Sequence, residues 1–199
     1  MQSAVSEALD RWGHIDVLLN NGIYVGPANM QLVLDLDLDD ARTLFEANIL
    51  AQIYLIQRVL PGMLDRNRGL ILNMVSGSAL HDPPAPANKG GWGFAYAASK
   101  AALIRLAGVL AIEHADSEVR FVNLEPGFVL TEAMKLNDPD GQLSKFVVGA
   151  PMEVPASVIA WLATDPAAAR YNGKIVFAQP LCLELGLQPD WRPAAPRRT

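Results

Sequence analysis

Short apolar runs alternate along this chain with longer stretches whose apolar residues recur at helical spacing. Each run ends in a polar turn, which is typical of strands buried on both faces of a parallel sheet. The four runs are residues 15–19, 69–75, 119–124 and 174–178. Helical spacing marks the stretches 3–12, 41–60, 94–114 and 154–162. This alternation predicts an α/β fold in which helices flank a parallel sheet.

A row of aspartates precedes the second helical stretch: Asp35, Asp37, Asp39 and Asp40. Asp37 stands three residues before Asp40, as an N-cap followed by acids at the positive end of a helix does. A metal loop is the alternative, but its glycine and terminal glutamate are missing, so we favour capping. The Pro-Gly pair that follows Leu60 is expected to interrupt this helix.

Composition places the chain among globular proteins. Of 199 residues, 51% are hydrophobic and 19% are charged, which is enough to bury a core within one domain. The formal net charge of −5, with no basic run before the last few residues, argues against a nucleic-acid partner. Charges break the apolar runs short of a membrane span and no signal-like leader opens the chain, so we expect a cytoplasmic protein without membrane contact.

The sequence predicts one folded domain over residues 1–187 and a Pro- and Arg-rich tail over 188–199. The single cysteine, Cys182, has apolar neighbours and no partner for an internal disulfide. We expect it to be a buried structural thiol.

One pair of side chains carries acid–base chemistry. Tyr96 and Lys100 are four residues apart in a predicted helix, so they stand one turn apart on the same face. An ammonium beside a phenol stabilises the phenolate by Coulomb attraction. The pair is therefore a candidate proton donor and acceptor, although the same spacing also fits a half-exposed aromatic beside a solvated charge.

Polar residues and a loop follow the second apolar run. The run delivers Ser76-Gly77-Ser78 to the carboxyl edge of the sheet, where open parallel sheets bind their ligands. The segment from His81 to Gly93 is rich in proline and glycine and is predicted to be irregular. The helix that carries Tyr96 begins directly after it.

Several short motifs, in order along the chain, resemble those of the short-chain dehydrogenase/reductase (SDR) family. The motifs are Asn20-Asn21-Gly22, Phe45-Glu46-Ala47-Asn48, Asn73-Met74-Val75-Ser76, Tyr96-x-x-x-Lys100 and Pro126-Gly127-Phe128-Val129-Leu130-Thr131. Together they cover essentially the whole chain. The resemblance implies a Rossmann-like parallel sheet and makes residues 1–187 a partial catalytic domain.

In that family a nicotinamide cofactor, NAD or NADP, exchanges a hydride with an alcohol or carbonyl carbon. The resemblance makes Tyr96 the general acid/base and Lys100 the cation that favours its ionised form and binds the nicotinamide ribose. Ser76 would hydrogen-bond the substrate oxygen, and Asn48 would hold a water that links Lys100 to solvent. No metal is implied. The implied cofactor contacts are Asn20, Gly22, Tyr96, Lys100, Pro126, Gly127, Val129 and Thr131.

Alternatives stay open for some of these residues. Asn20 and Asn48 also fit buried amides that satisfy turn backbone. Ser78 competes for the serine role, and we favour Ser76 because it follows the strand directly.

Two departures from the family pattern concern the surroundings of the site. Gly22-Ile23 stands where the family has Ala-Gly, which leaves one glycine for close approach to a ligand. Ser76 and Tyr96 are 20 positions apart, further than is usual in the family. An enlarged loop is therefore expected at the substrate entrance.

The largest departure is an absence from the sequence. The family's first strand, glycine-rich turn and second strand have no counterpart here, so the adenosine half of the cofactor site and the choice between NAD and NADP are missing. We expect an N-terminally truncated piece of a longer enzyme, beginning at an internal Met1. Residues 15–19 would then form a bare sheet edge, open to aggregation or to pairing with another chain.

The predicted function, if the missing part is supplied, is NAD(P)-dependent interconversion of an alcohol and a carbonyl in a small molecule. One alternative is a non-catalytic remnant that acts only through dimerisation or ligand-binding surfaces, and another is an α/β protein with a different ligand in the same cleft. The resemblance implies a homodimer or homotetramer packed through the helices near 40–60 and 94–115. Side chains of the loops that set substrate choice indicate an apolar or moderate-sized substrate: Trp92, Phe94, Phe128, Met134 and Phe146.

Overall fold

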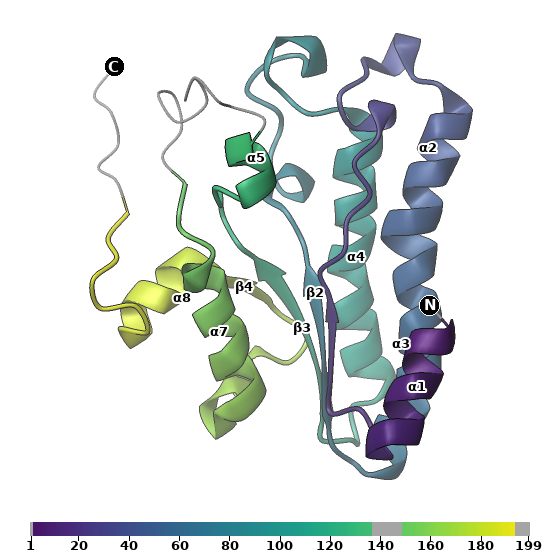
Figure 1. Cartoon of the computed structure of the whole chain (residues 1–199), viewed down its shortest axis with the longest axis vertical. Coiled ribbons are helices and arrows are strands. Elements are labelled where there is room, and N and C mark those ends of the chain that lie inside the picture. Colours follow the sequence, from purple (N-terminus) through teal and green to yellow (C-terminus); the bar gives the residue numbers. More distant parts are fainter. Residues whose placement is uncertain (1, 137–148, 194–199) are drawn as a thin grey trace.

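A computed structural model describes residues 2–136 and 149–193 of the chain. These residues form a parallel four-stranded sheet flanked by helices, as the sequence predicts (Figure 1). The strand order is β1-β2-β3-β4, with every neighbouring pair parallel. The strands are β1 (Val17–Asn20), β2 (Gly69–Met74), β3 (Val119–Glu125) and β4 (Ile175–Phe177).

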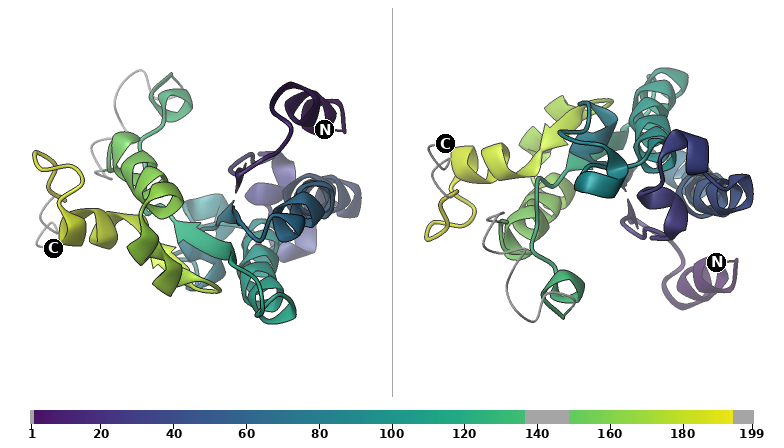
Figure 2. Two further views of the ribbon diagram at one scale, coloured as in Figure 1. Left: turned by 90° about the horizontal axis from the view of Figure 1, so that it is seen from below. Right: turned by 90° about the horizontal axis from the view of Figure 1, so that it is seen from above.

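Helices lie on both faces of the sheet. On one face are α1 (Gln2–Trp12), α3 (Ala51–Asp65) and α4 (Phe94–Glu113), and on the other are α7 (Glu153–Thr164) and α8 (Ala178–Leu185). The end views in Figure 2 show the two groups separated by the sheet. The short helix α5 (Glu132–Leu136) follows β3 beyond the carboxyl ends of the strands.

The alternation of side chains along the strands produces two cores. Ile71 and Phe121 point toward α3 and α4, where they pack with Met63 in a fully buried cluster. Leu72 and Leu124 point the other way, into the cluster around α7. Both sets are apolar, which explains why β2 and β3 appear in the sequence as continuous apolar runs.

The first turn of α2 (Leu38–Phe45) confirms the predicted cap. One carboxylate oxygen of Asp37 accepts hydrogen bonds from the backbone N–H groups of Asp39 at 2.7 Å and Asp40 at 3.1 Å. These contacts lower the pKa of the Asp37 carboxyl below its ordinary value. The aspartate row therefore starts a helix.

The predicted end of this helical stretch near Leu60 is wrong. After α2, a π-helical turn (Glu46–Leu50) leads directly into α3, which continues through Pro61 to Asp65. Pro61 is exposed, whereas Leu60 and Met63 beside it are buried in the core. Packing on both sides of the proline outweighs the hydrogen bond and clearance that its ring costs the helix.

Strand β1 forms a bare edge of the sheet. Its other side pairs with no strand among the described residues, and Val17 and Leu19 are 39% and 38% exposed. The sequence prediction that this strand is buried on both faces is therefore wrong in this structure. The expectation of an open edge is confirmed for residues 17–20, where the strand lies.

Helix α8 was not predicted. β4 is only three residues long, and the chain turns at Phe177 into a helix that ends at Gly186 in the left-handed conformation. Cys182 on this helix is buried, as expected, with its Sγ 3.8 Å from the Ser157 Oγ. Of the predicted tail, residues 188–193 are described and 194–199 lie outside the described part.

Helix α4 is the one described helix with the length and apolar composition that a membrane span would need. The sequence expectation that charges break every apolar run short of a span is too strict for this segment. In the fold α4 packs against β2 and β3, and Leu103 and Ala107 are fully buried there. The long apolar sequence of α4 is therefore explained by its packing in the core.

Candidate active site

Three asparagines join the carboxyl ends of the strands. Asn20, Asn73 and Asn123 stand in register on β1, β2 and β3. The Asn20 Nδ2 donates to the Asn73 Oδ1 at 2.9 Å, and the Asn73 Nδ2 donates to the Asn123 Oδ1 at 3.2 Å. Asn123 in turn donates to the Ile104 carbonyl of α4 at 2.8 Å. This buried ladder fixes the strand ends and ties α4 to them.

Sequence reasoning singled out Asn20 alone and missed the ladder. The signal was an asparagine late in each of three apolar runs, at Asn20, Asn73 and Asn123. Buried amides must find partners, and neighbouring strands place these three within reach of one another.

Lys100 is buried at the same edge of the sheet. Its side chain comes from the first half of α4 and is 3% exposed, and its Nζ donates to the carbonyl oxygen of Met74 at 2.9 Å. Burial lowers its pKa from 10.5 to about 8, because the charged form loses water that one carbonyl does not replace. No carboxylate pairs with Lys100 among the described residues. An anion brought close to this ammonium would be stabilised.

Tyr96 lies one turn before Lys100 on α4 and is half-buried. Ser99, on the turn between them, is fully buried and donates to the Tyr96 carbonyl at 2.8 Å. Their spacing puts Tyr96 and Lys100 one turn apart on the same side of α4, and the Lys100 Nζ reaches the end of β2.

Ser76 and Ser78 form a hydrogen-bonded pair directly after β2. The Ser78 Oγ donates to the Ser76 Oγ at 3.0 Å, and the Ser78 backbone N–H donates to the same oxygen at 3.2 Å. With both lone pairs of the Ser76 oxygen engaged, its own proton is free to donate elsewhere. Ser76 is half-buried whereas Ser78 is buried, so Ser76 is the better placed of the two for contact with a substrate.

Asn48 is fully buried within the π-helical turn between α2 and α3. Its Oδ1 accepts from the Tyr24 backbone N–H at 2.7 Å, and its Nδ2 donates to the Tyr24 carbonyl at 3.3 Å. The side chain thus satisfies backbone in the loop after β1. Its described contacts are with Tyr24 and not with Lys100. Functional sites often carry such π turns.

The cofactor candidates after β1 border a hollow of about 850 Å³ between this loop and α2–α3. Asn20 and Gln52 line it, and each has a buried amide oxygen without a hydrogen-bond partner among the described residues. Gly22 also lines it, but a Cβ there would meet no atom within 4 Å. The space beside Gly22 is therefore open within the described chain, and the close approach of a ligand there stays a prediction.

The cofactor candidates after β3 form a turn and a short bridge. Gly127 has a φ of +71°, a conformation that favours glycine. Val129 bridges in parallel to Ala150, and the Thr131 Oγ1 accepts from the Met134 backbone N–H at 3.2 Å. The turn at Pro126 is held by Gln179 of α8, a residue that sequence reasoning missed.

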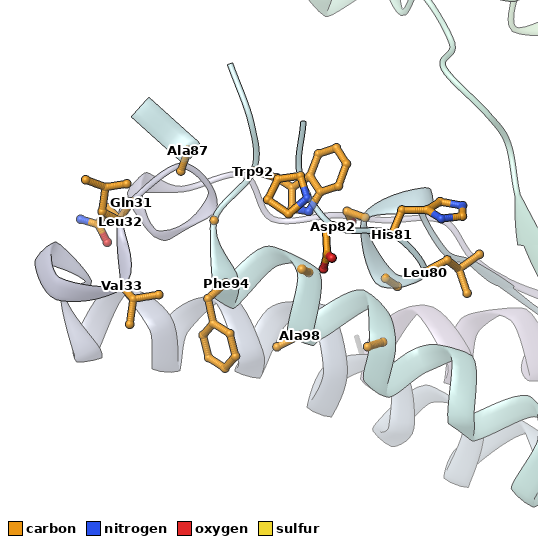
Figure 3. A pocket seen from close by; sticks show the side chains of 16 residues that line it. Gln31, Leu32, Val33, Leu80, His81, Asp82, Ala87, Trp92, Phe94 and Ala98 are labelled. Carbon is orange, nitrogen blue, oxygen red and sulfur yellow. The ribbon is translucent and has the colours of Figure 1, made fainter. Parts of the chain in front are cut away.

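A second hollow, of about 540 Å³, lies beside the first half of α4, on the helix face that carries Phe94 and Ala98 (Figure 3). Asp82 and Trp92 line it from the segment before α4, and Phe94 and Ala98 line it from α4. Residues 94 and 98 share a helix face that Tyr96 does not occupy. Ser78 lines this hollow, whereas its hydrogen-bond partner Ser76 is not among the lining residues.

The side chains that the sequence assigns to substrate choice therefore lie in two separate places. Trp92 and Phe94 belong to the 540 Å³ hollow, whereas Phe128 and Met134 lie beyond the end of β3 and are partly exposed. Phe146 lies outside the described residues. For the parts of the chain that are described, no cluster of three or more His, Cys, Asp or Glu side chains could hold a metal ion.

Comparison with known proteins gives consistent matches. A family model described as short chain dehydrogenase matches residues 1–141. The chain is 32% identical over 174 residues to a 3-oxoacyl-[acyl-carrier-protein] reductase of Synechocystis, covering 85% of this chain. It is 33% identical over 130 residues to an NADP-dependent 3-hydroxy acid dehydrogenase of Schizosaccharomyces pombe, covering 64% of this chain.

Solved structures agree with these sequence matches. A short-chain dehydrogenase/reductase family oxidoreductase from Burkholderia thailandensis superposes with a TM-score of 0.73 at 26% identity, covering 93% of this chain and 74% of that one. The chain spans 66% of the Synechocystis reductase and 46% of the Schizosaccharomyces pombe dehydrogenase. The family match, the motif order and the parallel sheet all agree, and the chain belongs to the short-chain dehydrogenase family.

Proposed function

We propose that this chain carries the catalytic half of an NAD(P)-dependent oxidoreductase that interconverts an alcohol and a carbonyl. The observation that carries the proposal is the buried Lys100 ammonium at the end of β2. It lies one helical turn from Tyr96, and the Ser76 hydroxyl follows the same strand. A buried cation that pairs with no described carboxylate, a phenol and a free hydroxyl proton suit proton transfer to and from a substrate oxygen.

The residues present fit a nicotinamide cofactor in part. The buried amide oxygens of Asn20 and Gln52 accept from no donor in the described parts of the chain and border the 850 Å³ hollow at the end of β1. A dinucleotide brings N–H and O–H groups that could meet such acceptors. The glycine-rich turn that holds the pyrophosphate in this family has no counterpart in the sequence. We therefore propose that these residues hold the nicotinamide half of the cofactor. They do not distinguish NAD from NADP.

When bound, the cofactor supplies or accepts the hydride. Tyr96 gives a proton to the substrate oxygen in the reducing direction and takes it back in the oxidising one. Lys100 stabilises the phenolate that remains, through its positive charge. Ser76 donates to the same substrate oxygen, because Ser78 occupies both of its lone pairs.

Other residues hold these groups in place. Asn48 anchors the loop after β1 through its two bonds to Tyr24. In the proposal, Asn20 and Gly22 hold the cofactor from the β1 side, and Pro126, Gly127, Val129 and Thr131 hold it from the β3 side. Lys100 also contacts the nicotinamide ribose.

We further propose a cytoplasmic homodimer or homotetramer with a small apolar or moderate-sized substrate. Apolar side chains remain exposed along α4, with Ile112 80% exposed and Val109 48% exposed. A hollow of about 410 Å³ between α3 and α4 is lined by Ile53, Leu60 and Leu106. An apolar face of this kind suits helix packing against a second copy.

A non-catalytic remnant is the second candidate function. It is favoured by the bare edge of β1, where Val17 and Leu19 offer apolar surface and unpaired backbone to another chain. Such a protein would bind partners without binding cofactor.

Cofactor titration separates the two candidates. The purified chain is titrated with NADH and NADPH while energy transfer from tryptophan to the bound nicotinamide is recorded. We expect saturable transfer with at least one of them. No binding at millimolar cofactor would favour the remnant.

A further inference from the structure

The turn after β3 is held by one side chain from a distant element. The Nε2 of Gln179, in the first turn of α8, donates to the carbonyl oxygen of Pro126 at 3.2 Å and to that of Phe128 at 3.1 Å. These two carbonyls flank Gly127, whose φ is +71°. A single amide group therefore spans the turn across 53 positions of sequence.

The chemistry of the contact fixes the orientation of the Gln179 amide. Both partners are carbonyl oxygens, which accept hydrogen bonds only, so the NH2 end must face them. Its two N–H groups match the two acceptors. A carboxylate of the same shape would instead place negative charge against both oxygens.

The turn leaves no room for a side chain at Gly127. A Cβ at Gly127 would stand 2.2 Å from the Gln179 Nε2 and 2.7 Å from its Cδ. Glycine at this position thus lets the backbone approach the amide closely enough to be held. The turn and the glutamine are complementary in shape as well as in hydrogen bonding.

The clamp extends to the segment that follows. The Phe128 carbonyl also accepts from the Ala150 backbone N–H at 2.9 Å, and the Leu130 N–H donates to the Ala150 carbonyl at 3.2 Å. Val129 lies between these bonds, in the bridge to Ala150. Gln179 therefore sets the position from which Val129 and Thr131 leave the sheet edge.

We propose that Gln179 is a positioning residue for the nicotinamide end of the cofactor, acting through the turn at Gly127. This inference rests on the proposed function, in which the segment from Pro126 to Thr131 borders the nicotinamide. Within the described part of the chain, both hydrogen bonds of the Gln179 side chain go to backbone carbonyls. Its role is to hold the segment in the shape that binds.

Hydrogen exchange of the full chain tests the clamp without any cofactor. In Gln179→Ala and Gln179→Glu we expect the Leu130 and Ala150 amides to exchange roughly five- to tenfold faster, the effect of losing one or two hydrogen bonds. Glu184→Ala is the control, since it alters an exposed side chain on the same helix. Unchanged exchange in both Gln179 variants would overturn the clamp.

Binding of nicotinamide mononucleotide tests the positioning role. We expect its Kd to rise about five- to tenfold in both Gln179 variants and to stay unchanged in Glu184→Ala. Faster exchange with an unchanged Kd would make the clamp purely structural and overturn the positioning role. If the wild-type chain binds no mononucleotide, the proposed function itself fails and the positioning role with it, while the exchange result still decides the clamp.

Discussion

The Nζ of Lys100 donates a hydrogen bond to the carbonyl oxygen of Met74, 2.9 Å away. This bond joins the first half of α4 to the last residue of β2. It places a buried ammonium where Ser76 leaves the strand. Among the described residues no carboxylate pairs with Lys100, so the ammonium is held at the sheet edge at a cost to folding.

That cost predicts a pH dependence of stability. The pKa of Lys100 is about 8 in the folded chain against 10.5 for a free lysine. Between these values the unfolded state keeps the proton and the folded state has lost it, so stability rises with pH through this window and levels off above it. The gain is on the order of 3 kcal/mol, at about 1.4 kcal/mol per pKa unit.

Urea unfolding at pH 7.5 and 10 measures this gain. Lys100→Met serves as the control, because other groups that titrate over the same range contribute equally to both proteins. We expect the wild type to gain more stability than Lys100→Met on going to the higher pH. Equal gains would show that the lysine is not buried as a charge.

The serine pair predicts unequal effects of two substitutions. Ser76→Ala removes the hydroxyl that we propose donates to the substrate oxygen and should lower kcat about 100-fold or more. Ser78→Ala removes only one donor to Ser76 and should cost about tenfold. Steady-state kinetics of both variants and of the double variant measure this. The double variant should be no slower than Ser76→Ala, because Ser78 acts through Ser76. A larger loss in Ser78→Ala would transfer the serine role to Ser78.

Pro61 predicts a stabilising substitution. Pro61→Ala restores a backbone N–H inside α3 and removes the ring clash, while it adds some freedom to the unfolded chain. We expect a net gain of about 1–2 kcal/mol in the free energy of unfolding, measured by urea denaturation. Gly62→Ala, which gains from helix propensity alone, is the control and should gain about 1 kcal/mol. A destabilised Pro61→Ala would show that the proline is required where it stands.

The exposed apolar face of α4 predicts self-association. Ile112→Glu places a charge on this face and should shift the chain toward a monomer in sedimentation experiments. Leu34→Glu replaces a more exposed leucine ahead of α2 and should leave the association state unchanged. If Leu34→Glu dissociates the protein and Ile112→Glu does not, the proposed interface is on the wrong face.

Much of the fold follows from periodicity. The runs ending near Met74 and Leu124 are continuously apolar because β2 and β3 bury both faces. The run ending near Asn20 gives the same signal, although β1 is partly exposed in this structure. The failures are instructive. Helix α3 continues through Pro61 because the neighbouring residues are buried in the core. This tertiary packing cannot be predicted from the local sequence around the proline. Helix α8 follows a three-residue strand, and Phe177 at its start gives no N-cap signal.

The candidate site was predictable where the family motifs carry it and unpredictable where contacts are long-range. Tyr96 and Lys100 follow from helical spacing, and Ser76 from its place after a strand. Gln179 was missed because its partners are backbone carbonyls more than 50 positions away. Every residue has such a carbonyl, so the sequence does not indicate which ones a distant side chain will bind. The burial of Lys100 against Met74 likewise needs the fold.

Turnover by Tyr96→Phe tests the central claim most directly. The wild-type chain and this variant are assayed with NADH or NADPH against a panel of aldehydes and ketones, following nicotinamide absorbance. The substitution removes one hydroxyl and leaves Lys100 and Ser76 in place. We predict turnover by the wild type and a loss of roughly 100- to 10,000-fold in the variant, with cofactor binding unchanged. Equal turnover by the two proteins, or none by the wild type with cofactor bound, would contradict the account.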